Sequence, residues 1–262
     1  MSSWDDLDRE LDAWGEAGRV ASLWWRDDDA RRPGPRLNRL IEVGDGLPLA
    51  LAAVPAEAEA SLADLPANVS FLPHGWRHVN LAPASEKKCE FGPHRPAFDR
   101  LADVALGWTR LRHLFGERAR PIFVPPWNRI DPAFVARLGH AGLTGLSRFG
   151  PRKAMHPAPG LTEMNCHVDI IDWRGTRGFV GDDAALAQFI AHLGARRIGG
   201  ARQDAATSVD GSVDAAEATG LMTHHAVHDA ECWEFLGKLC RNTAKHDAAR
   251  WLSADEAASL PP

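Results

Sequence analysis

Short apolar segments alternate with amphipathic ones along most of the chain, and this alternation limits the possible folds more than any other feature. The runs VASLWW (20–25), LPLALAAVP (47–55) and NVSFLP (68–73) are almost wholly apolar, and Gly or Pro stands near their ends. Runs of this length and composition are typical of strands buried on both faces. We therefore expect a parallel sheet covered by helices, either closed as a barrel or open.

Apolar residues at helical spacing lie between these runs and beyond them. Further strands are expected at 121–124 and 142–147. A Gly-punctuated polar stretch, residues 199–218, is expected to form a surface loop. The predicted helices cover residues 3–18, 36–43, 98–115 and 132–141.

Composition excludes several classes of function. The formal net charge of −5 provides no broad basic surface, so nucleic acid is not expected as a partner. No run approaches the roughly 18 apolar residues of a membrane span, and the acidic N-terminus has no basic start of a secretory signal. We therefore expect a cytoplasmic protein. The four cysteines form no CxxC pair, and the sequence does not indicate an oligomeric state.

Three adjacent carboxylates, Asp27, Asp28 and Asp29, follow the first apolar run directly. Like charges at this spacing raise the cost of ionising all three, and a nearby cation would relieve the repulsion. A metal ion is therefore a reasonable neighbour. The alternative is a solvated turn in which the carboxylates pair with Arg31 and Arg32.

Two histidine pairs at a spacing of four residues also follow apolar runs. They are His74 with His78, and His224 with His228. Two imidazoles four residues apart can lie on one face of a helical turn, and one carboxylate would complete a set of three metal ligands. Such a site leaves open positions for water and substrate and suits hydrolysis.

The order of these clusters resembles that of the polysaccharide deacetylase superfamily, also described as carbohydrate esterase family four or the NodB-homology domain. The resemblance extends roughly from Leu23 to His228. It implies a distorted (β/α) barrel of seven or eight strands, with residues 1–262 forming a single catalytic domain that starts with the helix at 1–18. The segments that carry it are RDDDA (26–30), HGWRH (74–78), VPPWNR (124–129), VDIIDW (168–173) and GLMTHHAVHD (220–229).

The first two motifs imply a metal centre. On the family pattern Asp27 is the general base, Asp28 is the metal-ligand carboxylate, and Asp29 stands in place of the usual Gly. A register shifted by one residue stays open. His74 and His78 complete the ligand set. The implied cofactor is a divalent transition metal, with Zn²⁺ first and iron, cobalt or nickel as alternatives.

The third motif departs from the family pattern, because Val124 stands where an Arg is expected to orient the base. Arg26 and Arg129 are both possible replacements, and the sequence does not decide between them. Trp127 and Asn128 in this motif are predicted substrate contacts, although a core role is an equal alternative for Trp127.

The fourth and fifth motifs imply the remaining catalytic groups. Trp173 would line the acyl pocket, and Asp172 would hold the catalytic histidine in the useful tautomer, with Asp169 as the alternative. His224 is the predicted proton donor to the leaving amine. His225 is the alternative for that role and otherwise a predicted substrate contact.

The segment KCEFGPHRP, residues 88–96, has no counterpart among these motifs. It suggests a divergent branch with substrate contacts of its own. Glu90 within it is predicted to form an ion pair at the surface.

Taken together, the motifs imply a metal-dependent hydrolase that removes an N-acetyl or other acyl group from an amino sugar or a related N-acylated small molecule. Without a secretory signal, an intracellular precursor is the expected substrate. One alternative is hydrolysis of another C–N bond, such as a formamide or a cyclic imide. The other is a non-catalytic metal-binding or carbohydrate-binding module, which Val124 in place of Arg favours.

Overall fold

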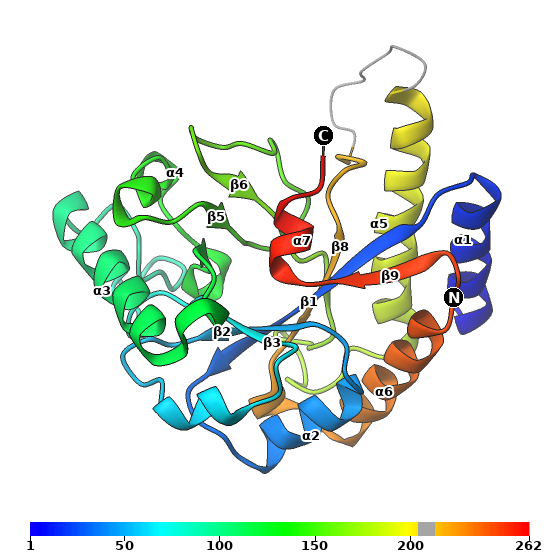
Figure 1. Ribbon diagram of the computed structural model, residues 1–262, viewed down its shortest axis with the longest axis horizontal. Coiled ribbons are helices and arrows are strands. Elements are labelled where there is room, and N and C mark those ends of the chain that lie inside the picture. Colours follow the sequence, from blue (N-terminus) through cyan, green and yellow to red (C-terminus); the bar gives the residue numbers. More distant parts are fainter. Residues whose placement is uncertain (204–212, 262) are drawn as a thin grey trace.

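In the computed structural model, which describes residues 1–203 and 213–261, a parallel sheet crosses the centre of the molecule (Figure 1). Its strand order is β3-β2-β1-β8-β7, and β9 pairs with the first half of β1. All of these pairs are parallel. The strands are β1 (Ala21–Ala30), β2 (Leu49–Ala53), β3 (Val69–Pro73), β7 (Val168–Asp169), β8 (Thr219–Thr223) and β9 (Ala249–Leu252).

A second parallel sheet continues the first around the molecule. It has the order β4 (Ile122–Phe123), β5 (Gly145–Leu146) and β6 (Thr162–Glu163). A bridge between His74 and Val124 joins β3 to β4. Within the described residues, no ladder joins β6 to β7, so the barrel is distorted. The predicted parallel α/β architecture is confirmed, and β9 adds a strand that the sequence did not indicate.

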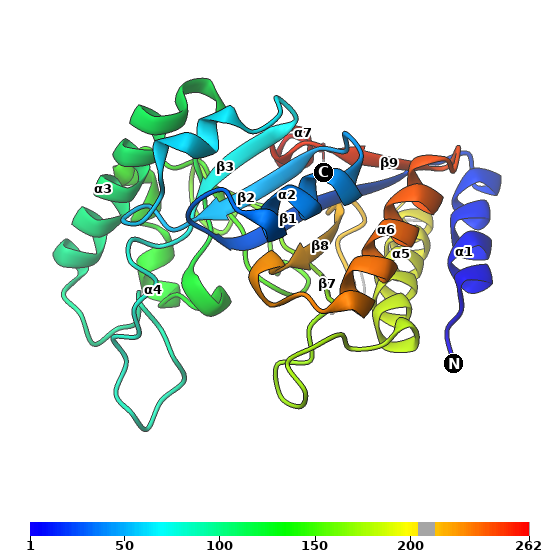
Figure 2. The same cartoon turned by 90° about the horizontal axis from the view of Figure 1, so that it is seen from below.

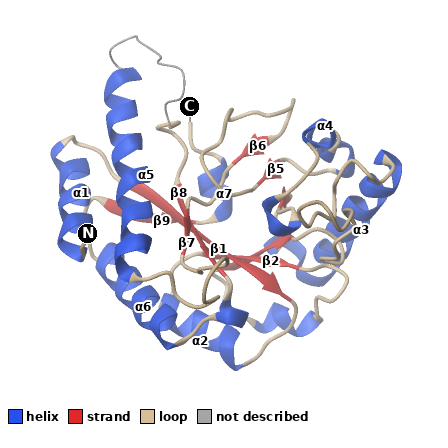
Figure 3. Ribbon diagram, turned by 180° about the vertical axis from the view of Figure 1, so that it is seen from behind, coloured by secondary structure: helices blue, strands red, loops and turns tan. Residues whose placement is uncertain are grey.

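Helices cover the outer face of the larger sheet (Figure 3). The predicted surface loop at 199–218 is corrected in part, because residues 199–203 belong to α5; residues 204–212 lie outside the described part of the chain. None of the described helices is both long and apolar enough to span a membrane. The helices are α1 (Trp4–Glu16), α2 (Pro35–Gly44), α3 (Ala97–Phe115), α4 (Pro132–Val135), α5 (Asp182–Gln203), α6 (Ala230–Ala244) and α7 (Ala254–Ala258).

Successive side chains of β1 face two different cores. Leu23 and Trp25 pack in the cluster beneath the helices, whereas Trp24 packs in the barrel interior with residues of both sheets. All three are at most 1% exposed. Burying a large apolar side chain stabilises the fold by roughly 1.5–3 kcal/mol. This double burial explains why β1 is a continuous apolar run that ends abruptly in carboxylates.

A β-bulge ends this alternation at the carboxylates. Asp28 pairs with Ala52 and Ala30 pairs with Ala53, so Asp29 is an extra residue in the strand. Its φ of 74° lies in the left-handed region, where a non-Gly residue is uncommon. Because of the bulge, Asp28 and Asp29 line the same pocket instead of facing opposite sides of the sheet.

Candidate metal centre and active site

Asp29, His74 and His78 form a cluster with the geometry of a metal site. Asp29 Oδ1 lies 3.4 Å from His74 Nε2 and 3.2 Å from His78 Nε2. The three residues offer ligand atoms that all lie within 4.8 Å of one another. Asp29 Oδ1 is buried and makes no hydrogen bond within the described structure. A carboxylate and two imidazoles are a ligand set that suits Zn²⁺ and related transition metals.

The surroundings of His74 leave the correct nitrogen free for a cation. Its Nδ1 lies 3.0 Å from the carbonyl oxygen of Val124, which can only accept a hydrogen bond. Nδ1 therefore carries the proton, and the lone pair of Nε2 faces Asp29. Burial lowers the pKa of His74, but the negative carboxylates of Asp29 and Asp28 nearby more than offset this and raise it. The same attraction would hold a metal cation.

His78 reaches the cluster through an unusual backbone conformation, with a φ of 56°. Burial lowers its pKa to about 4, with a further contribution from His74. The imidazole is therefore neutral at pH 7, as a metal ligand must be. These donor atoms fit a divalent metal, and the position of Asp29 corrects the prediction that Asp28 joins the two histidines.

Asp28 instead forms a buried ion pair with Arg26. Arg26 Nε and Nη2 donate to the two carboxylate oxygens at 2.7 and 3.0 Å, and neither side chain is more than 2% exposed. Burial acts to lower the pKa of Arg26, but Asp28 reverses this and raises it. Arg26 also donates to Ser147 Oγ and Asn128 Oδ1, each at 2.7 Å. The guanidinium thus holds the carboxylate in one orientation.

Arg26 and Arg129 are the two arginines that the sequence left open as replacements, and Arg26 is the one that bonds a carboxylate of this pocket. Arg129 lines the same pocket, but its Nη1 donates to the carbonyl of Lys88 at 2.9 Å. Val124 is fully buried, and its carbonyl serves His74. The arginine that contacts a carboxylate of this pocket thus comes from β1.

Asp27 faces away from this pocket, as the strand alternation requires. Its carboxylate accepts hydrogen bonds from Thr223 Oγ1 at 2.7 Å and from the backbone N–H of His225 at 2.9 Å. His225 Nδ1 lies 2.5 Å from its other oxygen. These contacts hold the Asp27 carboxylate, and neither Asp27 nor His225 lines the pocket. The structure therefore does not support the predictions of Asp27 as the base and of His225 as a substrate contact or proton donor.

His224 is the histidine at the end of β8 that enters the pocket. Its Nε2 lies 4.0 Å from Asp28 Oδ2, and its ring meets Trp173 edge-on with a centroid distance of 4.7 Å. Asp169 is the acidic residue beside it. Burial raises the pKa of Asp169, and the charge of His224 opposes that rise. Trp173 Nε1 donates to Asp169 Oδ2 at 2.7 Å, which joins the two groups that flank His224.

Asp172 has a different position from the one predicted. It is half-buried, it does not line the pocket, and its carboxylate accepts hydrogen bonds from the backbone N–H groups of residues 174–176. These bonds lower its pKa. Asp172 therefore shapes a turn, and Asp169, the alternative from the sequence, is the carboxylate near His224.

Trp127 and Asn128 follow β4 with φ values of 56° each. The Trp127 ring lies 4.4 Å from the ring of His78, whereas Asn128 Oδ1 accepts from Arg26. Both side chains, with Trp173, border a pocket of about 610 Å³, a size typical of small-molecule sites. The groups at its base are Asp28, Asp29, His74, His78, Asp169 and His224.

Comparisons with known proteins place this geometry in a known fold. No family model and no curated protein matches the sequence. A solved structure assigned as a polysaccharide deacetylase from Mycobacterium smegmatis matches with a TM-score of 0.61 and 15% identity, over 92% of this chain and 90% of that one. The chain has the polysaccharide deacetylase fold.

Two further structures agree with this assignment of the fold. A peptidoglycan deacetylase from Bacillus subtilis matches with a TM-score of 0.53 and 9% identity, over 92% of this chain and 91% of that one. The chitin deacetylase from Colletotrichum lindemuthianum matches with a TM-score of 0.52 and 13% identity, over 93% and 90%. At these identities the likeness concerns the deacetylase fold alone.

Glu90 supports the metal centre from a segment outside the predicted motifs. It is 1% exposed, and its carboxylate accepts hydrogen bonds from the backbone N–H groups of Arg77 at 2.8 Å and His78 at 3.2 Å. A Cβ atom on Gly75 would lie 2.2 Å from the same carboxylate, so this turn requires glycine. Glu90 therefore fixes the loop that carries both histidines, in contrast to the surface ion pair expected from the sequence.

A second cluster of possible metal ligands lies at the opposite end of β8. His167, His192 and Glu217 are all buried and offer ligand atoms within 4.8 Å of one another. However, His167 Nδ1 accepts the backbone N–H of Gly220 at 3.0 Å, so the proton is on Nε2, which lies 3.3 Å from Glu217 Oε2. That nitrogen has no lone pair for a metal. The cluster is consequently a buried polar contact within the deacetylase fold.

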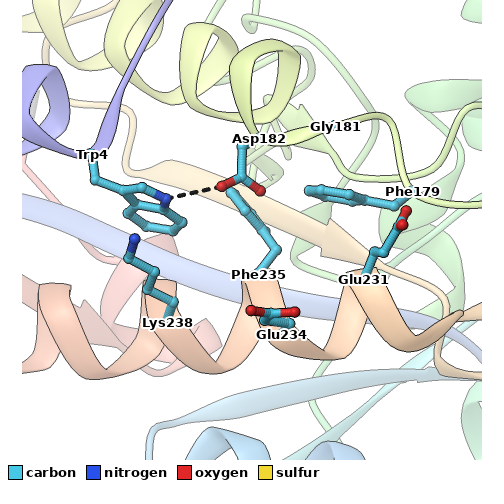
Figure 4. A pocket seen from close by; sticks show the side chains of 8 residues that line it. All are labelled: Trp4, Phe179, Gly181, Asp182, Glu231, Glu234, Phe235 and Lys238. Carbon is cyan, nitrogen blue, oxygen red and sulfur yellow. Dashed lines mark hydrogen bonds between the residues drawn. The ribbon is translucent and has the colours of Figure 1, made fainter.

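A separate hollow of about 400 Å³ lies among α1, the loop before α5, and α6 (Figure 4). Trp4 Nε1 donates to Asp182 Oδ2 at 3.0 Å, and Lys238 Nζ lies 4.4 Å from the centroid of the Trp4 ring. The residues lining this hollow include no histidine and none of those lining the pocket described above. It is therefore separate from the candidate active site.

Proposed function

We propose that this chain is a metal-dependent hydrolase that removes an N-acetyl group from an amino sugar or a related N-acylated compound. The observation that carries the proposal is the convergence of a metal-ligand cluster, a carboxylate held by arginine and a histidine in one pocket. The fold supports it, because matched structures include a chitin deacetylase and a peptidoglycan deacetylase.

Asp29, His74 and His78 would hold the metal, and Zn²⁺ is the ion that two imidazoles and one carboxylate favour most readily. A bound divalent cation would polarise the amide carbonyl and make water more acidic. The three protein ligands leave further coordination positions for water and substrate.

The remaining groups would transfer the protons. Asp28, oriented by Arg26, is placed to remove a proton from the attacking water. His224, across the pocket from it, is placed to donate a proton to the leaving nitrogen. Asp169 and Trp173 fix the position of His224. The amide is thereby cleaved into an amine and a carboxylic acid.

The ion pair of Arg26 and Asp28 favours catalysis over a non-catalytic binding module. Val124 was the sequence feature that favoured the binding module, because the arginine expected to orient the base was missing. Arg26 supplies two hydrogen bonds to the carboxylate from a neighbouring position on the same strand. This contact supports a catalytic role, because Arg26 would orient Asp28 as the base.

The test is release of acetate from a panel of N-acetylated sugars by the zinc-reconstituted protein. Asp28→Asn should reduce kcat by at least about 10²-fold while the metal is retained. Asp64→Asn is the matched control, because Asp64 is exposed and does not line the pocket. We expect its kcat to stay within a few fold of wild type. Full activity in the Asp28 variant would contradict the proposal.

A further inference from the structure

Four cationic side chains border the pocket above the metal cluster. They are Lys88, Arg129, Arg174 and Arg177, and we refer to them as the cationic rim. Three of them are exposed, and Arg129 is half-buried. The whole chain carries a formal net charge of −5, so this concentration of positive charge is local and does not reflect overall composition.

Within the part of the chain that the structure describes, no side chain of the cationic rim forms an ion pair with a carboxylate. Every ion pair found in residues 1–203 and 213–261 is formed by an arginine or histidine outside the rim. The three acidic residues of the pocket lie at its base and have partners there. Asp28 bonds Arg26, Asp29 faces the two histidines, and Asp169 accepts from Trp173.

Two loops carry three of these cations on one side of the molecule. Figure 2 shows the loop between β3 and α3, and the loop between β7 and α5, extending in the same direction from the barrel. The second loop is closed by the backbone hydrogen bond from Asp172 N–H to the carbonyl of Gly178, at 2.9 Å. The carboxylate of Asp172 then bonds backbone N–H groups between Arg174 and Thr176. The turn thus presents Arg174 and Arg177 at the mouth of the pocket.

From this arrangement we infer that the substrate is anionic, with a phosphate or carboxylate group that the cationic rim binds while the acyl amide reaches the metal cluster. The inference rests on the proposed function and specifies the substrate class. Arginine matches both groups, because its planar fork can donate two parallel hydrogen bonds to phosphate or carboxylate oxygens. A bound divalent metal at the base would add to the positive potential.

A neutral substrate would gain less from this rim than an anionic one, because its hydroxyl groups accept weaker hydrogen bonds from arginine and lysine than phosphate or carboxylate oxygens do. Unpaired cations concentrated around a cleft raise the local concentration of anions and speed their association. Aromatic surfaces of Trp127 and Trp173 border the same pocket and would contact a sugar face in either case. The rim is therefore the feature that distinguishes an anionic from a neutral sugar.

The experiment compares binding of N-acetylglucosamine, its 1-phosphate, its 6-phosphate and N-acetylmuramic acid by calorimetry. The zinc-loaded Asp28→Asn protein serves as the reference, so that turnover does not obscure binding. We expect at least one anionic compound to bind about tenfold more tightly than the neutral sugar at low salt. Preference for the phosphates or for the carboxylate identifies which anion the rim binds.

Substitution of the rim tests its role. Arg174→Gln combined with Arg177→Gln should remove most of the preference, and Lys88→Ala should reduce it. The matched controls are Arg137→Gln and Lys87→Ala, which are exposed and do not line the pocket. They should leave the preference unchanged.

The inference is overturned if neutral and anionic sugars bind equally, if none of the anionic compounds binds, or if the double substitution leaves the preference intact. Failure of the proposed function gives a different result. In that case the anionic compounds bind through the rim, but wild-type protein releases no acetate from them.

Discussion

The buried ion pair between Arg26 and Asp28 leads to a quantitative prediction. Replacing Arg26 by Met keeps the unbranched stem but leaves Asp28, which is 2% exposed, without its cation. Removing one partner of a buried pair typically costs about 3–5 kcal/mol, because the other charge stays buried and unpaired. For a chain of this size, this corresponds to a fall in Tm of roughly 6–20 °C.

A double variant distinguishes the effect of leaving Asp28 buried without a cation from the effect of removing the arginine side chain itself. When Arg26→Met is combined with Asp28→Asn, no uncompensated charge remains. We therefore expect the double variant to be less destabilised than the sum of the single variants, with a coupling energy of about 2–3 kcal/mol. Urea unfolding of all four proteins gives this value directly.

The same variants separate the ion pair from the metal centre. Arg26 makes none of the contacts that hold Asp29, His74 and His78, so Arg26→Met should retain its metal and lose kcat by about 10²-fold. Additive destabilisation in the cycle would refute the argument that the charges compensate each other. Unchanged kcat in Arg26→Met would refute the argument that this arginine orients the base.

Three further predictions follow from the same structure. Glu90→Ala removes the hydrogen bonds that hold the turn carrying His78 and should weaken zinc affinity about 10–100-fold. Glu86→Ala, at an exposed position in the same loop, should leave zinc affinity unchanged. Competition with a chelating dye measures the zinc affinity of both variants. His228 stacks edge-on against Trp233, makes no hydrogen bond through either ring nitrogen in the described structure, and has its pKa lowered by burial to about 4. Because the folded state binds the proton less readily than the unfolded state does, the stability that depends on neutral His228 is fully present above about pH 6.5 and is lost as the pH falls towards 4. Between pH 7 and 5 this loss is about 2 kcal/mol, and His228→Phe should abolish it. An unchanged pH dependence of Tm in this variant would contradict the prediction. Removal of bound metal by a chelator should lower the Tm, and added Zn²⁺ should restore it, because binding to the folded state alone stabilises that state.

The sequence predicted the fold well because its strands are buried on both faces. Runs such as residues 47–55 and 68–73 are too short for a typical helix and lack the alternating polar residues of a half-exposed strand. They therefore indicate strands of a parallel sheet covered on both faces. The short strand β9 was missed, since its four residues include an exposed arginine and resemble a loop. Tertiary pairing with β1, rather than local propensity, makes it a strand.

The candidate site was predicted in part. His74, His78 and His224, which the sequence singled out, line one pocket, and their roles stay predictions. Within the row of three carboxylates, Asp29 rather than Asp28 lies beside the two histidines, which is the one-residue shift that the sequence left open. The bulge at Asp29 breaks the alternation on which side-chain direction depends. A bulge arises from pairing with β2 and leaves no separate signal in the sequence.

Two supporting residues show a further limit of sequence patterns. Arg26 stands directly before the carboxylates, and its spacing of two from Asp28 places both on one face of a strand. This spacing would have predicted the ion pair between Arg26 and Asp28 once both residues were known to lie in the same strand. Glu90 gave no such signal, because its partners are backbone N–H groups brought near it only by the folded loop.

The identity of the metal-ligand carboxylate is decided by metal content after purification, measured by mass spectrometry on wild type, Asp29→Ala and Asp28→Asn. We predict about one transition metal per chain in wild type and in Asp28→Asn, and loss of the metal in Asp29→Ala. Loss in Asp28→Asn with retention in Asp29→Ala would contradict the assignment of the ligands. Wild-type protein that binds no metal, even with added zinc, would contradict the metal centre itself.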